Sequence, residues 1–421
     1  MFSLSMDERG RSADDEGQSA EDVFLDKLGV PVIQTVTTMR SRSRYDSSDT
    51  GVMGFELALS VALPEFDGNV ITHPISGKER TDDDAGIGSA PKQHFPIDDR
   101  IDHVARLAVN WAELRHTPND EKQVAVVLHN YPPSDDGIGT AFGLDSPEST
   151  VNLLEELDSR GYDLGDTMPD SGQSLVERLT AQLTLDDRWV APEDVREMSV
   201  DTVSPAQYGE WFETLDADFR ENVVEEWGDP PERPFAIPGV EFGNVLVTVQ
   251  PPRGFGMDPS KVYHDSDLQP PHDYVAFYRW LRNSYETDAV VHLGTHGSLE
   301  WLPGKTVGLD GESAPDQLID DIPNVYPYIV NNPGEGPRRS GVLRRHRGLL
   351  DAGDGQRRDL RRLGRPGRTG RPLPRGRHGR RPDRRRRAPR RAAPPDRRRT
   401  GPRRRTRHRR RNRREGRRTW P

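Results

Sequence analysis

Side chains that could bind a metal ion or accept a proton gather in one short segment. The run His292-Leu293-Gly294-Thr295-His296-Gly297-Ser298-Leu299-Glu300 combines two imidazoles, one carboxylate and two glycines. The apolar residues Ala289–Leu293 predict a buried strand, so His296 lies in the loop beyond its carboxyl end, where α/β sheets bind ligands. An imidazole and a carboxylate with open coordination positions suit Co²⁺ or Zn²⁺. The same pair could accept protons from a substrate.

A structural interpretation of the same residues stays open from spacing alone. A histidine near a strand end commonly bonds a backbone carbonyl, and Glu300 in the first turn of a helix would complement the helix dipole. His264 and His272 lie upstream as weaker candidates for a site.

Strands and helices that alternate along the chain position this segment. The pattern predicts strands over 30–36, 124–128, 244–249 and 289–293, turns over 63–88, and helices over 101–114, 146–161, 175–183, 205–227 and from about 272. A strand, a helix and a second strand in that order form a parallel unit. We therefore predict an α/β fold of parallel-sheet βα units in two sub-domains.

Composition divides the chain into four predicted regions. An acidic, disordered leader covers 1–22, an α/β region covers 23–228, and an α/β unit that carries the histidine segment covers 229–336. Residues 337–421 hold 36 Arg, no Lys and 6 acidic residues, a net charge of +30, and almost nothing to bury. Such a tail is expected to be disordered.

The charge of the first 336 residues indicates an unusual setting. They carry 24 basic and 63 acidic residues, a net charge of −39. In molar salt the Debye length falls to roughly 3 Å and most of the self-repulsion disappears, which favours a halophilic host over an acidic surface for a basic partner. GAC codons for Asp, read two bases out of phase, become CGA codons for Arg. The tail is thus interpreted as an out-of-frame product, and nucleic-acid binding through it is the alternative.

Several classes of protein are excluded. The chain has no cysteine, so disulfides, thiolate ligands and thiol catalysis are ruled out. It has no apolar run of about 18 residues and no secretory signal, which predicts a cytoplasmic protein without a membrane span. Gly304-Lys305-Thr306 fails as a P-loop because Leu299 stands where the first glycine belongs. The glycines of 137–143 fail the dinucleotide fingerprint, since the third glycine comes one position late.

Longer motifs resemble the large-subunit family of cobalt and magnesium chelatases. They lie in order at 63–68, 128–133, 143–147, 250–256, 262–268, 270–281 and 292–305. The segments Gln250-Pro-Pro-Arg-Gly and Tyr263-His-Asp-Ser-Asp-Leu are similar to the cobalt branch rather than the magnesium branch. Family members are longer at both ends, and the resemblance stops after Gly336. The chain therefore looks like a truncated fragment with a shifted reading frame at its end.

The resemblance implies insertion of Co²⁺ into hydrogenobyrinic acid a,c-diamide, a corrin precursor of cobalamin, with magnesium insertion as the alternative. In that family the large subunit holds the tetrapyrrole and the metal, while AAA-type partner subunits supply ATP hydrolysis with its Mg²⁺. By this resemblance His296 and Glu300 handle the metal and accept protons, and His292 supports or ligates the metal. Arg253, His264 and His272 are the candidates for holding the ring.

Overall fold

A computed structural model describes residues 30–66, 68–80, 91–129, 138–141, 144–182, 198–254, 265–294 and 297–327. The predicted leader and the predicted Arg-rich tail lie outside the described residues, as do His264 and His296. Within the described part of the chain, no helix is both long and apolar enough to cross a membrane.

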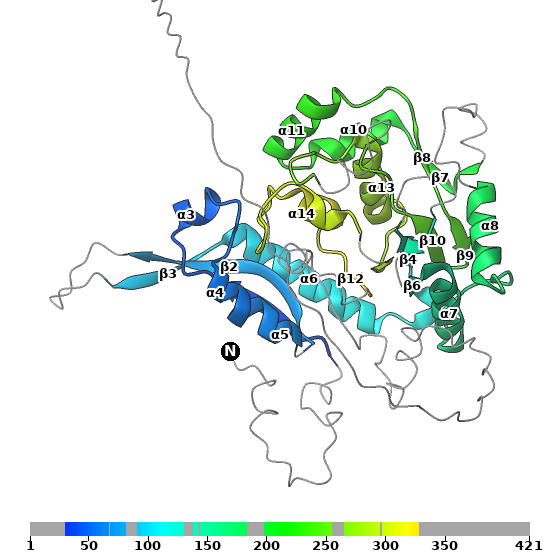
Figure 1. Ribbon diagram of the computed structural model, residues 1–421, viewed down its shortest axis with the longest axis horizontal. Coiled ribbons are helices and arrows are strands. Elements are labelled where there is room, and N and C mark those ends of the chain that lie inside the picture. Colours follow the sequence, from blue (N-terminus) through cyan, green and yellow to red (C-terminus); the bar gives the residue numbers. More distant parts are fainter. Residues whose placement is uncertain are drawn as a thin grey trace, which may run out of the picture. The chain divides into compact units, whose positions relative to one another are not determined.

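A five-stranded sheet forms the centre of the fold, in the order β12-β11-β4-β10-β9. Figure 1 labels β4, β9, β10 and β12 of this sheet. Its strands are β4 (Val124–Leu128), β9 (Val240–Phe242), β10 (Val245–Val249), β11 (Ala289–Leu293) and β12 (Asn324–Val325). The central strand β4 pairs in parallel with β10 and β11, β12 is parallel to β11, and only β9 is antiparallel. All five residues of β4, β10 and β11 are buried, as expected for a parallel sheet with both faces covered.

Alternate side chains of β4 point into two separate cores. Ala125 and Val127 belong to a core with α10 (Pro205–Glu213), α11 (Ala217–Trp227), α13 (His272–Asn283) and α14 (Ala314–Ile319). Val124, Val126 and Leu128 belong to a core with α7 (Ser146–Ser159) and α8 (Gly172–Gln182). The α/β fold with parallel βα units is thereby confirmed.

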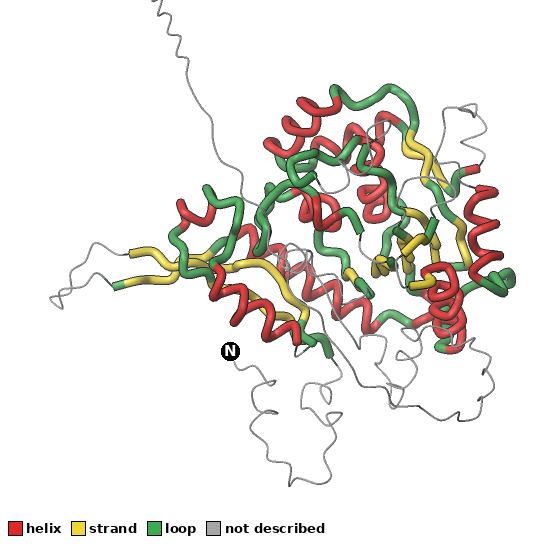
Figure 2. The backbone as a smooth tube through the Cα atoms, in the orientation of Figure 1, coloured by secondary structure: helices red, strands yellow, loops and turns green. Residues whose placement is uncertain are grey.

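A smaller sheet precedes the central one along the chain. It consists of β1 (Ile33–Thr37), β2 (Val70–Arg80) and β3 (Lys92–Pro96), with β1 and β2 parallel and β3 antiparallel to β2. The long helix α6 (Asp98–His116) packs on β2 through Leu107 and Trp111, which contact Val70. Figure 2 shows the strands of this sheet as a group apart from the central strands.

Short elements complete the described structure. The helices α3 (Arg42–Asp46), α4 (Gly54–Glu56) and α5 (Leu63–Phe66) and the π-helix η2 (Leu57–Ala62) lie between β1 and β2. Two small antiparallel pairs are β5 (Thr140–Ala141) with β6 (Leu144–Asp145), and β7 (Asp201–Val203) with β8 (Phe235–Ile237). Single 3₁₀ turns occur at η3 (Asn119–Glu121) and η6 (Leu299–Trp301).

Two sequence predictions about elements are wrong. Turns were predicted over 63–88, but α5 and the eleven-residue strand β2 occupy 63–66 and 70–80. This strand was not recognised because Pro74 and the nearby glycines interrupt its run of β-branched residues. One helix was predicted over 205–227, yet the chain forms α10 and α11. The side chain of Asp216 accepts the N–H groups of Asp218 and Phe219, and this cap starts a new helix.

The strand order of the five-stranded sheet also concerns the predicted boundary between the regions 23–228 and 229–336. Strand β4 comes from before that point and lies between β10 and β11, which come after it. The two predicted α/β regions are therefore stretches of sequence that share one sheet and its two cores.

Candidate active site

The residues that follow four parallel strands line one small cavity. His129 follows β4, Gln250 follows β10, Gly294 follows β11 and Tyr326 follows β12. The carboxyl ends of parallel strands meet at one edge of a sheet, which is where such sheets bind ligands. The cavity measures about 10 Å³, enough for roughly one water molecule. As described, it has no room for a macrocycle.

Glu300 bonds two residues of the cavity lining, Gly297 and Tyr326, which hold its carboxylate in place. It sits in the 3₁₀ turn η6, where the sequence favoured the first turn of a helix, and it is 4% exposed. Its Oε1 accepts a hydrogen bond from the hydroxyl of Tyr326 at 2.8 Å and from the N–H of Gly297 at 3.2 Å. The carboxylate is therefore fixed in position at the carboxyl end of the sheet.

Gly297 allows the backbone to approach this carboxylate closely. A Cβ atom at position 297 would lie 3.0 Å from the hydroxyl oxygen of Tyr326, 3.4 Å from Oε2 of Glu300 and 3.5 Å from Nε2 of Gln250. A side chain here would crowd the hydroxyl of Tyr326 and would come into van der Waals contact with Glu300 and Gln250. The glycine therefore avoids a tight contact with Tyr326.

Gln250 joins β10 to the segment that carries Glu300. Its Oε1 accepts from the N–H of Ser298 at 2.9 Å, and its Nε2 donates to the hydroxyls of Tyr274 at 3.0 Å and Tyr278 at 2.8 Å. The hydroxyl of Tyr274 is 2.8 Å from Oγ of Ser298 and closes a ring of bonds. Burial raises the pKa of both tyrosines, so their hydroxyls stay protonated.

Both ring nitrogens of His292 form hydrogen bonds within this network. Nδ1 lies 2.8 Å from Oδ1 of Asn324, and Nε2 lies 2.9 Å from the hydroxyl of Tyr278. The amide oxygen can only accept, so Nδ1 carries the proton and Nε2 accepts from Tyr278. Burial lowers the pKa of His292 to about 4, and the ring is neutral. This geometry favours a supporting role, and metal ligation by His292 stays a prediction.

The other predicted site residues are placed in different ways. Arg253 is buried, and its Nη2 donates to the carbonyls of Asp265 at 2.9 Å and Leu268 at 2.7 Å. Burial lowers its pKa to about 10. His272 contacts the hydroxyl of Tyr208 at 2.7 Å and the carbonyl of Gly228 at 2.9 Å. These bonds favour positioning roles, and ring binding by either residue stays a prediction.

The structure thus brings Glu300 and His292 into one hydrogen-bonded region, while His296 and His264 fall outside the described residues. Sequence reasoning missed Gln250, Ser298 and Tyr326. Gln250 and Tyr326 each directly follow the last residue of a parallel strand. Their place after a strand was the one sequence signal that could have predicted them as site residues.

The side chain of Lys305 has a structural role. Its ammonium group is buried, lies 2.9 Å from Oδ2 of Asp310, and donates to the carbonyls of Asp46 at 3.0 Å and Ser48 at 3.2 Å. It also lies 5.0 Å from the ring centre of Tyr45. The lysine of Gly-Lys-Thr therefore ties its loop to α3, consistent with the failure of the P-loop pattern.

Comparison with known proteins shows the family of this chain. Residues 1–342 match the family described as CobN/Magnesium Chelatase. The chain belongs to this family. It is 42% identical over 319 residues to the aerobic cobaltochelatase subunit CobN of Pseudomonas aeruginosa, covering 73% of this chain and 25% of that protein. A magnesium-chelatase subunit from Chlorobaculum parvum is 33% identical over 315 residues, covering 72% of this chain and 22% of that protein.

A solved structure agrees with the family assignment. The catalytic subunit of cobaltochelatase from Mycobacterium tuberculosis superposes with a TM-score of 0.64 at 37% identity, covering 76% of this chain and 27% of that chain. This chain therefore spans about a quarter of the length of the relatives it matches. The match covers one region of these longer proteins.

Proposed function

We propose that this chain supplies part of the tetrapyrrole- and metal-binding site of a cobaltochelatase large subunit. In this proposal Co²⁺ is the substrate metal and hydrogenobyrinic acid a,c-diamide is the ring. Support comes from the greater identity to a cobaltochelatase subunit, 42%, than to a magnesium-chelatase subunit, 33%. ATP hydrolysis would belong to AAA-type partner subunits, in the cytoplasm where ATP is available.

The fixed carboxylate of Glu300 is the single observation that carries the chemical part of the proposal. Inserting Co²⁺ into the corrin ring forms metal–nitrogen bonds and releases the inner N–H proton of the ring, so a base must stand beside the ring. Glu300 is oriented by Tyr326 and by the N–H of Gly297. A carboxylate held in this way accepts a proton without first reorganising its surroundings.

The neighbouring groups fit a positioning role in this scheme. Gln250 bonds both Ser298 and the hydroxyls of α13, and these bonds connect the ends of β10 and β11. His296 would add the metal-handling imidazole, as the family motif implies. Since the cavity holds roughly one water molecule, the ring would need either the remainder of the subunit or a movement of the adjoining segments.

Ring binding tests the proposal directly. Trp301 follows Glu300, so its fluorescence should report a macrocycle bound at this edge of the sheet. We expect quenching by hydrogenobyrinic acid a,c-diamide in molar KCl, and weaker quenching by protoporphyrin IX. Stronger binding of the porphyrin would favour the magnesium branch. Failure of both rings to bind, in this chain and in the longer subunit, would refute the proposal.

A further inference from the structure

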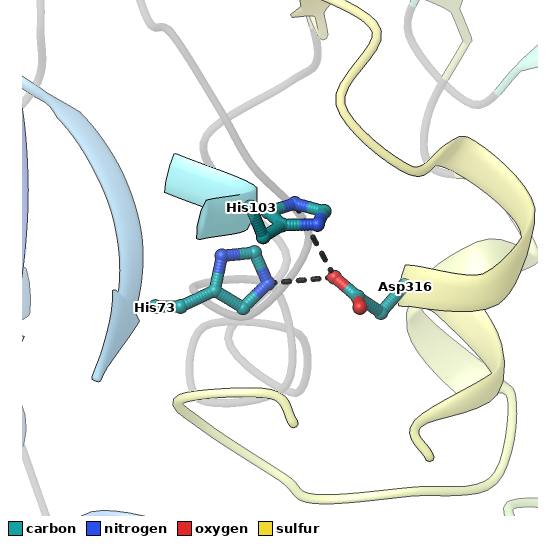
Figure 3. A group of neighbouring side chains, drawn as sticks. All are labelled: His73, His103 and Asp316. Atoms are coloured by element: carbon teal, nitrogen blue, oxygen red, sulfur yellow. Dashed lines mark hydrogen bonds and ion pairs between the residues drawn. The ribbon is translucent and has the colours of Figure 1, made fainter. Parts of the chain in front are cut away.

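A second group of metal-ligating side chains lies outside the site described above. His73 comes from β2, His103 from α6 and Asp316 from the first turn of α14. Figure 3 shows the two rings and the carboxylate directed toward one another. One nitrogen of each ring and one oxygen of the carboxylate lie within 4.8 Å of one another, and all three residues are buried. We propose that His73, His103 and Asp316 bind a divalent transition-metal ion, with Zn²⁺ as its simplest representative.

The distances suit a small ion. Oδ1 of Asp316 lies 2.7 Å from Nε2 of His73 and 3.6 Å from Nε2 of His103. Tetrahedral ligands at about 2.1 Å from Zn²⁺ are separated by roughly 3.4 Å, which falls between these two values. Two imidazoles and a carboxylate are a known zinc ligand set that leaves a position for water. Small movements of three side chains would therefore complete the site.

Nε2 of His103, the ring nitrogen that faces Asp316, is available to bind a metal ion. His103 is 2% exposed, and its Nε2 makes no hydrogen bond within the described residues. The other ring nitrogen, Nδ1, lies 3.7 Å from Oδ1 of Asp320. Burial lowers the pKa of His103 to about 4, which leaves the ring neutral. A buried ring nitrogen without a hydrogen-bond partner is costly in a protein interior, and a metal ion would satisfy Nε2 in the tautomer that carries its proton on Nδ1.

His73 needs one proton shift to become a ligand. Its Nε2–H bonds Asp316, whereas its buried Nδ1 makes no hydrogen bond within the described residues. Moving the proton from Nε2 to Nδ1 exposes the Nε2 lone pair to the ion.

Charges around the cluster hold the carboxylate in the orientation that binding needs. Nη1 of Arg100 bonds Oδ2 of Asp316 at 2.6 Å, so that Oδ1 faces the histidines. The Arg100 charge is balanced by Asp99, whose Oδ2 lies 2.8 Å from Nε. Hydrogen bonds to the far oxygen of a ligating carboxylate are a common feature of metal sites. The ion would connect β2, α6 and α14, and the proposal does not depend on the chelatase function.

Zinc retention by the full chain tests this site. We would purify the chain without a histidine tag, load it with Zn²⁺ in molar KCl, remove free ion by gel filtration and measure bound zinc by mass spectrometry. We expect His103→Gln to bind Zn²⁺ at least about tenfold more weakly than the wild type. His116→Gln is the matched control, because His116 is an exposed histidine on the same helix. His103→Gln should still fold, since it removes no hydrogen bond from Nε2.

The Glu300→Gln variant separates this ion from the substrate metal. We expect it to retain one equivalent of Zn²⁺, and Zn²⁺ should raise the melting temperature of this variant but not of His103→Gln. Four-coordinate Co²⁺ in the same variant should give strong visible absorption. A wild-type chain that retains no zinc would overturn the proposal, as would equal affinity in His103→Gln. Loss of the ion from Glu300→Gln alone would place it at the other site and overturn it too.

Discussion

The hydroxyl of Tyr326 donates a 2.8 Å hydrogen bond to Oε1 of Glu300, although the two residues are 26 positions apart. The bond exists because β11 and β12 are adjacent and parallel, so the segments that leave their carboxyl ends meet. Through this bond, Tyr326, which follows β12, fixes the orientation of Glu300, the carboxylate of the predicted site among the described residues.

Replacement of this carboxylate should abolish metal insertion. Glu300→Gln keeps the size of the side chain and removes its ability to take a proton from the ring. A general base contributes about 10²- to 10⁴-fold to a rate, so we expect a loss of at least about 100-fold. The measurement is Co²⁺ insertion into the corrin with ATPase partner subunits present. Glu155→Gln, at an exposed position of α7, should retain the wild-type rate. Equal rates in both variants would remove Glu300 from the mechanism.

Loss of the Tyr326 hydroxyl should have a smaller effect than loss of the carboxylate. Tyr326→Phe leaves the ring in place and removes one hydrogen bond to Glu300. Hydrogen bonds to charged groups contribute about 1.5–3 kcal/mol, which corresponds to roughly a 10- to 100-fold lower insertion rate. The KM for the ring should change little if Tyr326 acts only through Glu300. A double variant that is no slower than Glu300→Gln alone would show this coupling, whereas additive effects would contradict it.

The regular elements of the central sheet could be predicted because their signals are local. The residues of β4 and β11 form short apolar runs, and each strand coincides with the predicted range. The α13 helix begins at the predicted His272 because its buried face repeats with helical spacing. Strand β2 was missed because Pro74 interrupts its pattern and because its pairing with β1 and β3 is not visible locally.

The site could be predicted only in part, for a related reason. Glu300 belongs to a recognisable motif, but Gln250 and Tyr326 reach it from other strands. Their roles depend on strand order, which sequence spacing does not specify. The His73, His103 and Asp316 cluster is a stronger example, because its members are separated by up to 243 positions along the chain.

A methyl group at position 297 should disturb the site more than the fold. Gly297→Ala would place Cβ 3.0 Å from the hydroxyl oxygen of Tyr326 and 3.4 Å from Oε2 of Glu300, so the Tyr326 hydroxyl that orients Glu300 must shift. Such overpacking costs about 1–3 kcal/mol, measurable as a lower free energy of unfolding in urea. Insertion activity should fall with it, because the carboxylate loses its position.

The matched control for this prediction is Gly209→Ala in α10. A Cβ atom there meets nothing within 4 Å, and alanine is favoured over glycine inside a helix by about 0.5–1 kcal/mol. The control should therefore unfold at equal or higher urea concentration than the wild type. A Gly297→Ala variant as stable and active as this control would show that Tyr326 and Glu300 tolerate displacement.

The buried ring of His292 should make stability fall as the solution becomes more acidic. Burial lowers its pKa to about 4, whereas a histidine in the unfolded chain has a pKa of about 6.5. Between these values the unfolded chain binds a proton that the folded chain does not, so the free energy of unfolding decreases as pH falls. One such group contributes a slope of at most about 1.4 kcal/mol per pH unit. Burial lowers the pKa of His272 as well, which adds a slope of the same sign.

Urea unfolding of the wild type, His292→Gln and His116→Gln between pH 4 and 7 isolates this contribution. The curve of His292→Gln should be flatter than that of the wild type across the window, although the variant is less stable at pH 7 because Tyr278 and Asn324 lose a partner. His116→Gln, which changes an exposed ring, should follow the wild type. Parallel curves for wild type and His292→Gln would mean that the His292 ring takes up its proton without unfolding the chain, contrary to its position between Tyr278 and Asn324.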